Sequence, residues 1–391
     1  MTHIKKLAAL LLVTILMGCS TTHTLDIRIP EKGYEQAIVG DIADNTSKEP
    51  LRFWAGEQDD FLYSELNKST PLKVQGDALN ILVLSGGGAK GAFGTGIVNG
   101  LYEQDKLEQY TIVTGVSAGA LIAPFAFLGG DEVPRLKEVM LGITDKEVIG
   151  KRNFLNTLFK DGFSNGDNML EFITHVYNPE MIEQIAKQHQ AGRRLFIGTT
   201  QFDSGRLSIW NIGQIANSDI ENKQVLIHQI IAASSSIPGV FPPQFIQVNY
   251  QGEQYEELHV DGGLSAQMFF EPTQTDFSKV SKALGLTQQP YIHVIRNGMF
   301  NMPYEPTPDK GMKLLTRSLK SLTVLQSRGD LYKMLYDSEL QQIDLRFTYV
   351  DDEFKAPSKT KAMFDLEYMK ALYQYGFDKV VNGTVWSQEL P

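Results

Sequence analysis

From residue 79 onward, two short apolar runs each end in a glycine-rich turn and lead into an apolar helical pattern. Residues 81–85 read ILVLS, a continuous apolar run typical of parallel strands that are buried on both faces. A helix is predicted from about 91 to 104, and the next strand lies in TIVTG, residues 111–115. This alternation of strands and helices predicts an α/β fold, with a parallel sheet covered by helices on both faces.

The later part of the chain continues the pattern. Further strands are predicted at 193–203, 206–212, 242–250, 255–261 and 291–298, and further helices at 224–236, 310–345 and 362–380. Residues 131–192 are mainly helical and amphipathic, with a loop at FKDGFSNGDN. This insertion is interpreted either as a lid over the site or as packing helices of the core, and the pattern does not decide between them.

The first residues have the features of a processing segment. Lys5 and Lys6 precede an apolar run at 7–17, which is too short to span a bilayer as a helix. The run ends at Gly18-Cys19, which resembles the bacterial lipobox, where the cysteine becomes lipidated and N-terminal. We therefore expect a signal peptide at 1–18 and a lipid anchor at Cys19. By resemblance to such lipoproteins, a serine at position 20 favours sorting of the protein to the outer membrane over retention in the inner membrane.

Composition narrows the class of protein. The net charge is −10, and no basic run is present, so binding to nucleic acid is not expected. No histidines and acids are grouped at metal-ligand spacing, and we expect neither a metal nor another cofactor. We expect the chain to consist of three parts: the signal peptide, a polar tether and lead-in segment at 19–78, and one folded domain at 79–391. The oligomeric state is not indicated.

Ser117 is the candidate nucleophile. It lies in GVSAG, a G-x-S-x-G pattern that directly follows the strand 111–115. Gly115 and Gly119 flank it where the tight turn leaves no room for side chains. The hydroxyl would stand at the N-terminus of the next helix, whose dipole favours developing negative charge. The alternative is a turn serine that only caps this helix.

The turn GGGAKG at residues 86–91 is the candidate anion cradle. It also fits G-x-G-x-x-G, but no acid ends the second strand, as a dinucleotide site requires, and no Lys-Ser/Thr follows as in a P-loop. The N–H groups of Gly87 and Gly88 are expected to form an oxyanion hole. Two interpretations of Lys90 are open: it would add positive potential near a substrate phosphate, or it would be a solvated residue in the first turn of the following helix.

Asp261 is the candidate base. It ends the strand ELHV and precedes Gly262-Gly263, so the backbone beyond it is free to bend. A carboxylate that is held close and partly desolvated can accept the serine proton directly. A plain Asp-Gly turn is the alternative interpretation. A histidine base, His259 or His293, remains a rival, although neither lies on an evident late loop.

Together, GGGAKG, GVSAG and DGG, in that order, resemble the patatin-like phospholipases. The resemblance extends to SSSIPGVFPP, GRRLFIGTTQFDSG and FDLEYMKALYQYGFDK, and it covers roughly residues 79–380. It implies a three-layer α/β/α sandwich with a central, mostly parallel sheet. It also implies a Ser117–Asp261 dyad without histidine and an oxyanion hole at Gly86, Gly87 and Gly88. Ser85 and Lys90 stand where many members have aspartate and arginine.

These observations lead to an expected function. The chain is expected to be a lipid-anchored serine acyl hydrolase of the phospholipase or lysophospholipase type, acting on membrane lipids or related acyl esters. A serine hydrolase with a histidine base is one alternative. The other is a non-catalytic envelope lipoprotein that keeps the fold for interaction or lipid binding.

Overall fold

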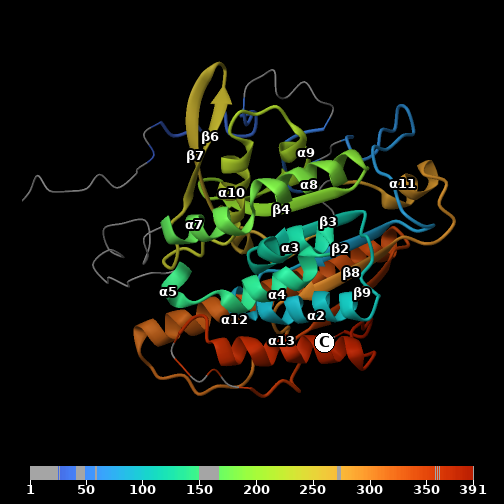
Figure 1. The fold of residues 1–391 in the computed structure, drawn as a ribbon. Coiled ribbons are helices and arrows are strands. Elements are labelled where there is room, and N and C mark those ends of the chain that lie inside the picture. Colours follow the sequence, from blue (N-terminus) through green and yellow to red (C-terminus); the bar gives the residue numbers. More distant parts are fainter. Residues whose placement is uncertain are drawn as a thin grey trace, which may run out of the picture.

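Five parallel strands form the centre of the molecule (Figure 1). The computed structural model describes residues 25, 27–40, 49–57, 60–148, 167–270, 274–356, 358, 360 and 362–390. Across the sheet the strands follow the order β4 (Arg194–Gln201), β3 (Ile112–Val116), β2 (Asn80–Leu84), β8 (Tyr291–Arg296) and β9 (Asp344–Tyr349). β2 and β3 are adjacent, so the turns that follow them meet at the same edge of the sheet.

Antiparallel strands extend the sheet beyond β4. They are β5 (Arg206–Asn211), β1 (Arg52–Trp54), β6 (Gln244–Tyr250) and β7 (Glu253–Asp261). β7 overlaps β4 only at its last three residues, where Asp261 pairs with Thr199 near the carboxyl end of β4. β7 runs antiparallel to β4, and its last residue, Asp261, therefore lies at the edge of the sheet where the parallel strands end.

The helices cover both faces of the sheet. Along β2, Leu82 and Leu84 point into one apolar core and Ile81 and Val83 into the other, as the two-residue period of a strand requires. The first core contains side chains of α2 (Gly91–Glu103), α3 (Ala118–Leu128), α4 (Glu132–Gly142), α5 (Asp145–Val148), α7 (Asp167–Val176), α8 (Pro179–Gln190), α9 (Ile212–Asn217), α10 (Lys223–Ser234) and α13 (Leu366–Val381). The second contains side chains of α11 (Phe277–Ala283) and α12 (Gly311–Leu340).

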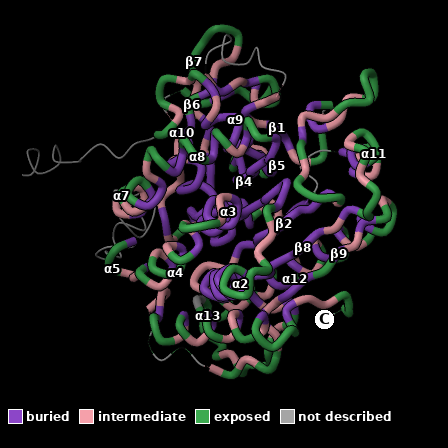
Figure 2. Tube along the Cα trace, turned by 45° about the vertical axis from the view of Figure 1, so that its right-hand side comes forward, coloured by how far each residue is buried: buried purple, intermediate pink, exposed green. Residues whose placement is uncertain are grey.

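The expected fold class is confirmed. Figure 2 shows the buried trace running through the sheet, with exposed segments at the outer sides of the helices. Two cores separated by one sheet make three layers, α/β/α, and the central strands are parallel. No helix in the described part of the chain is both long and apolar enough to cross a bilayer.

Two expectations about the elements need revision. The helix predicted at 310–345 ends at Leu340, because Gln342 takes a positive φ of 56° and the chain then enters β9. Along Asp344–Tyr349 only Arg346 is exposed, and the segment pairs in parallel with β8, a tertiary contact that a helical period does not reveal. In the insertion 131–192, the described helices α4, α5, α7 and α8 bury apolar side chains in the core.

Part of the expected tether and lead-in segment lies on the domain. Ile29, Ala37 and Val39 are buried, and Ile38 pairs with Asn249 of β6. The expected signal peptide at 1–18 and the expected lipidation site Cys19 lie outside the described residues, so both remain predictions.

Candidate active site

Ser117 stands on a strained corner between β3 and α3. Its φ of 54° lies in the left-handed region that non-glycine residues rarely adopt, so the surrounding packing must hold it there. A Cβ on Gly115 would lie 2.6 Å from the Gly119 carbonyl oxygen, and one on Gly119 would lie 2.1 Å from the Leu84 carbonyl oxygen. Both flanking glycines are therefore required by the close approach of backbone to backbone.

The Ser117 hydroxyl donates to the Asp261 carboxylate. The distance from Oγ to Oδ2 is 2.6 Å, and the other carboxylate oxygen accepts the Gly263 N–H at 2.7 Å. Burial raises the pKa of Asp261 to about 6, although both hydrogen bonds act to lower it. The carboxylate is therefore a stronger base than an exposed aspartate and remains ionised at neutral pH.

A serine that sequence reasoning did not single out fixes the corner. Ser234, at the end of α10, accepts the Ser117 N–H at 2.9 Å and donates to the Gly198 carbonyl at 2.7 Å. A Cβ on Gly262 would lie 2.4 Å from that same carbonyl oxygen. Ser234 thus holds the nucleophile, β4 and the turn after Asp261 close together. Three serines are adjacent at 234–236, and nothing in the sequence distinguishes Ser234 from the other two.

The glycine turn after β2 presents two free donors. The Gly86 N–H donates to the Gln267 carbonyl at 3.0 Å, so it is already engaged. The N–H groups of Gly87 and Gly88 donate to no group among the described residues. Gly88 has a φ of 56°, and a Cβ on Gly87 would lie 2.1 Å from the Asn297 carbonyl oxygen. The turn lies beside the nucleophile, because a Cβ on Gly86 would meet the Ser117 Cβ at 3.2 Å.

Residues at the end of β8 brace this turn. The guanidinium of Arg296 donates to the Gly86 carbonyl at 2.7 Å and to Ser85 Oγ at 3.2 Å. The Asn297 side chain donates to the Ser85 carbonyl at 2.8 Å and accepts the Gly94 N–H at 3.0 Å. The Ser85 hydroxyl thus accepts hydrogen bonds from the Arg296 guanidinium and the Asn297 N–H, both at the end of the neighbouring strand.

Gln267 joins the two turns to α12. Its carbonyl accepts the Gly86 N–H, and its side chain donates to the Gly263 carbonyl at 2.7 Å. Its own N–H donates to Asp330 of α12 at 2.7 Å. Burial raises the pKa of Asp330 to about 6. Neither residue belongs to a recognisable motif, which is why the sequence did not indicate them.

The two candidate histidines are engaged elsewhere. His259 is buried, with Nδ1 at 2.9 Å from Thr199 Oγ1 and Nε2 at 3.0 Å from Glu257 Oε2. His293 contacts the Tyr110 hydroxyl through Nδ1 at 2.8 Å and stacks on Trp386. The only side-chain partner of the Ser117 hydroxyl in the described part of the chain is a carboxylate.

A cavity of about 1000 Å³ opens over Ser117 and Asp261. Its apolar wall includes Ile237, Leu264, Met299, Met302, Val324, Phe354 and Met363, and its cations are Lys90, Arg296, Lys320 and Lys355. Burial, Arg296 and Lys320 together lower the pKa of Lys90 to about 8. No described carboxylate pairs with the Lys90 ammonium. The cavity therefore combines an apolar surface with an uncompensated positive charge beside the glycine turn.

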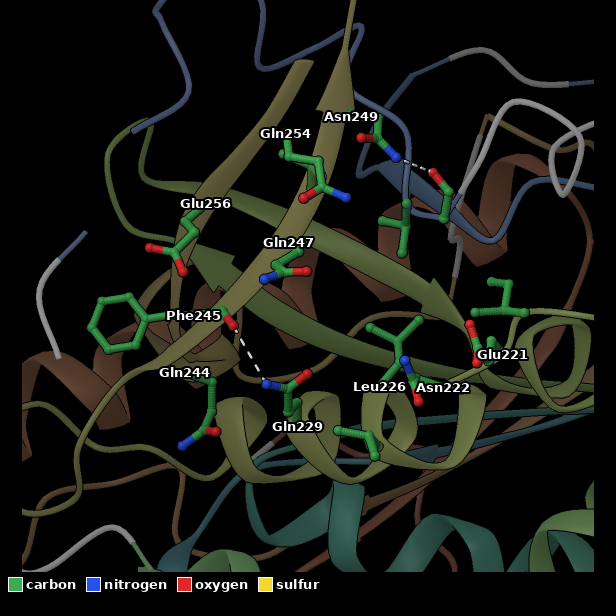
Figure 3. Close-up of a pocket in the computed structure, with 15 residues that line it drawn as sticks. Glu221, Asn222, Leu226, Gln229, Gln244, Phe245, Gln247, Asn249, Gln254 and Glu256 are labelled. Atoms are coloured by element: carbon green, nitrogen blue, oxygen red, sulfur yellow. Dashed lines mark hydrogen bonds between the residues drawn. The ribbon is translucent and has the colours of Figure 1, made fainter. Parts of the chain in front are cut away.

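The described residues of the insertion 131–192 do not line this cavity. Its lining comes instead from the two glycine turns, residues of 299–305 and of α12, and described residues of 352–356, 358 and 363–368. A separate cavity of about 720 Å³ lies between α10 and the β6–β7 hairpin (Figure 3). Its lining includes six amide side chains among fifteen residues, and one of them, Gln229, donates to the Phe245 carbonyl at 3.4 Å. It contains none of the predicted site residues.

Comparisons with known proteins found a matching family model and a curated relative. Residues 82–273 match the family model described as Patatin-like phospholipase. A segment of 176 residues, 41% of this chain, is 30% identical to Triacylglycerol lipase 4 of Saccharomyces cerevisiae and covers 18% of that protein, so the chain spans less than a fifth of this relative.

Two solved structures are similar at low identity. VipD from Legionella pneumophila aligns over 87% of this chain and 72% of its own, at 13% identity and a TM-score of 0.42. ExoU from Pseudomonas aeruginosa, solved with SpcU, aligns over 43% of this chain and 40% of its own, at 18% identity and a TM-score of 0.27. The family match contains both glycine turns and Asp261. Over residues 82–273, this chain is similar to the patatin-like phospholipases.

Proposed function

We propose that this protein is a serine acyl hydrolase that cleaves membrane lipids or related acyl esters with a Ser117–Asp261 dyad. One observation carries the proposal: the hydroxyl of a serine on a strained strand-to-helix corner donates to a buried carboxylate at 2.6 Å. The family match and the lipase relative support a lipid ester as the substrate class.

In the first half of the reaction, Ser117 Oγ attacks the ester carbonyl carbon while Asp261 removes the hydroxyl proton. The carbonyl oxygen becomes an oxyanion, and the N–H groups of Gly87 and Gly88 stabilise it together with the N-terminal end of α3. When the tetrahedral intermediate collapses, the C–O bond to the alcohol breaks. The proton on Asp261 passes to the leaving oxygen, and an acyl-Ser117 ester remains.

The second half reverses these roles. Asp261 removes a proton from water, whose oxygen attacks the acyl carbon in the same oxyanion hole. Collapse breaks the bond to Ser117 Oγ, which regains the proton, and a fatty acid leaves. All groups needed for both halves belong to this chain.

The cations of the cavity favour a substrate that carries a phosphate. Lys90 is adjacent to the proposed oxyanion hole and lacks a described counter-ion, whereas Lys320 lies 3.9 Å from the Glu305 carboxylate. An anionic headgroup would therefore compensate the charge of Lys90 beside Arg296. We therefore propose phospholipids or lysophospholipids as substrates, with the acyl chain against the methionine and leucine side chains of the wall. Replacement of Lys90 by methionine is expected to reduce turnover of a phospholipid more than that of a neutral ester.

We further propose that the protein acts at the cell envelope, anchored through lipid on Cys19 and placed at the outer membrane. The proposal rests on the apolar run at 7–17 that ends in Gly18-Cys19, followed by Ser20. A lipase that is tethered to a membrane meets its substrate without dissociating between turnovers.

Purified full-length protein tests the reaction. It should release fatty acid from a defined phospholipid panel and become labelled on Ser117 by a fluorophosphonate probe. Ser117→Ala should abolish labelling and lower hydrolysis by at least about 10³-fold. Ser204→Ala, in the turn between β4 and β5, is the matched control and should keep full activity. A Ser117→Ala variant that still hydrolyses esters would show that another group is the nucleophile.

A further inference from the structure

The long helix α12, orange in Figure 1, exposes several leucines along its N-terminal half. Five of them form what we term the leucine face: Leu314, Leu315, Leu319, Leu322 and Leu325. The exposed fraction of these five residues lies between 47% and 62%. A surface helix normally turns its apolar stripe toward the core and its polar residues toward water, so this arrangement is inverted.

Helix periodicity places the leucine face opposite the core contact. At about 100° per residue, the five leucines fall within less than half of the helix circumference. Val324, Ser327 and Leu331 are buried and lie on the other side. The first three turns of α12 contain almost no buried residue, so this part of the helix projects from the domain with its apolar side uncovered.

The charge of this part of α12 differs from that of the whole chain. Residues 311–329 contain Lys313, Arg317, Lys320 and Arg328 and no acid, whereas the chain carries a net charge of −10. A helix with leucines on one side and only cations among its charged residues has the composition of a helix that lies in a membrane interface containing anionic lipid.

The leucine face also lies beside the active-site cavity. Lys320, Thr323 and Val324 of the same helix line the cavity that contains Ser117. Tyr304, 94% exposed, extends the apolar surface from the preceding loop. Arg317 fixes this loop to α12, since its guanidinium donates to the Pro303 carbonyl at 2.7 Å. Docking through α12 would bring the cavity to within about one helix diameter, roughly 10 Å, of the bilayer surface.

We propose that the leucine face of α12 is an interfacial docking surface for a lipid bilayer that contains anionic phospholipids. The apolar side chains insert among the acyl chains near the headgroups. Lys313 and Arg328, which form no ion pair among the described residues, contact the lipid phosphates, whereas Arg317 and Lys320 pair with Glu305. This proposal rests on the proposed function, because it supplies the route by which a membrane lipid reaches Ser117.

Binding can be measured apart from catalysis and apart from a lipid anchor. The full chain carrying Ser117→Ala and Cys19→Ser is mixed with vesicles of phosphatidylcholine and phosphatidylglycerol in equal parts, and the bound fraction is measured by flotation. Adding Leu319→Ser and Leu322→Ser should lower the partition coefficient by at least about tenfold. Leu66→Ser with Leu390→Ser is the matched control, since both leucines are highly exposed elsewhere, and should leave binding unchanged.

Further measurements separate the possible outcomes. Lys313→Gln should weaken binding to the anionic vesicles about fivefold and leave binding to pure phosphatidylcholine unchanged. With Ser117 intact, the leucine double variant should still hydrolyse a soluble short-chain ester at the normal rate but lose activity on vesicles. Unchanged vesicle binding by the double variant overturns the docking proposal, as does a change of oligomeric state without a change in vesicle binding. Failure of the wild type on every ester instead contradicts the proposed function alone.

Discussion

At the scale of single residues, Asp261 combines two opposing effects. Its carboxylate is buried next to Ser117, and burial raises its pKa to about 6, from an ordinary value of 3.8. The folded state therefore holds the proton more tightly than the unfolded chain does. Between about pH 4 and pH 6 the folded protein binds more protons, so this group lowers the stability as pH rises through that window. The basicity proposed for catalysis is obtained at a cost in folding free energy.

Replacing Asp261 by asparagine should reveal both effects. Hydrolysis should fall by about 10³-fold or more, because the amide cannot accept the Ser117 proton. The free energy of unfolding at pH 7 should rise by on the order of 1–3 kcal/mol, since two pKa units correspond to about 2.7 kcal/mol. Near pH 4 the gain should disappear. Denaturant unfolding at both pH values, alongside ester hydrolysis, makes the comparison. An inactive variant that is also destabilised at pH 7 would contradict this account of Asp261.

The same carboxylate sets the expected pH dependence. Only ionised Asp261 can act as a base, so kcat/KM should be level above about pH 7 and fall about tenfold for each unit below about pH 6. A histidine base would give a limb in a similar range, so the profile must be repeated with His293→Ala. His293 contacts Tyr110 and Trp386, so the variant should keep the same profile. Loss of the limb with this variant would favour a histidine base.

At the scale of elements, the sequence indicated those parts of the site that depend on local backbone. The glycines flanking Ser117 and those of the first turn are recognisable, because each permits a close approach that no side chain allows. The continuous apolar runs also predicted the buried parallel strands correctly. Arg296, Gln267 and Asp330 could not be predicted, since their roles come from hydrogen bonds between distant segments. β9 was missed for a related reason: its pairing with β8 is a tertiary contact.

The turn after β2 gives a prediction at this scale. In Gly87→Ala, the new Cβ would lie 2.1 Å from the Asn297 carbonyl oxygen, so the turn must shift and its two free N–H groups with it. We expect kcat to fall by about 10²-fold or more while the protein remains folded, as happens when an oxyanion donor is lost. Gly142→Ala is the control, because its φ lies outside the left-handed region and a Cβ there would meet no atom within 4 Å. Normal kcat in Gly87→Ala would exclude this turn as the oxyanion hole.

At the scale of the whole molecule, positive charge is concentrated where lipid is proposed to bind. The chain is acidic overall, yet four cations line the cavity above Ser117, against the three acids Asp261, Glu305 and Asp352. The leucine face lies on the same helix as Lys320, so the proposed docking surface and the proposed headgroup site share one element. An acidic protein with this distribution should be repelled from anionic membranes except in one orientation, the one that presents the cavity.

This orientation and the expected anchor at Cys19 act together. Several acyl chains on one cysteine would hold the protein at the membrane by themselves, whereas the leucine face alone would give weaker, reversible binding at a high effective lipid concentration. In a Gram-negative host, Cys19→Ser should therefore move most of the protein out of the membrane fraction but leave a residue that salt removes. Leu319→Ser with Leu322→Ser alone should leave the protein membrane-bound, because the lipid remains. Only the combined variant should be fully released.

Membrane fractionation with immunoblotting measures this release, and mass spectrometry of the N-terminal peptide reports whether Cys19 carries acyl chains. If Cys19→Ser stays as firmly attached as the wild type, Cys19 is not the anchor, and the leucine face would then have to hold the protein alone.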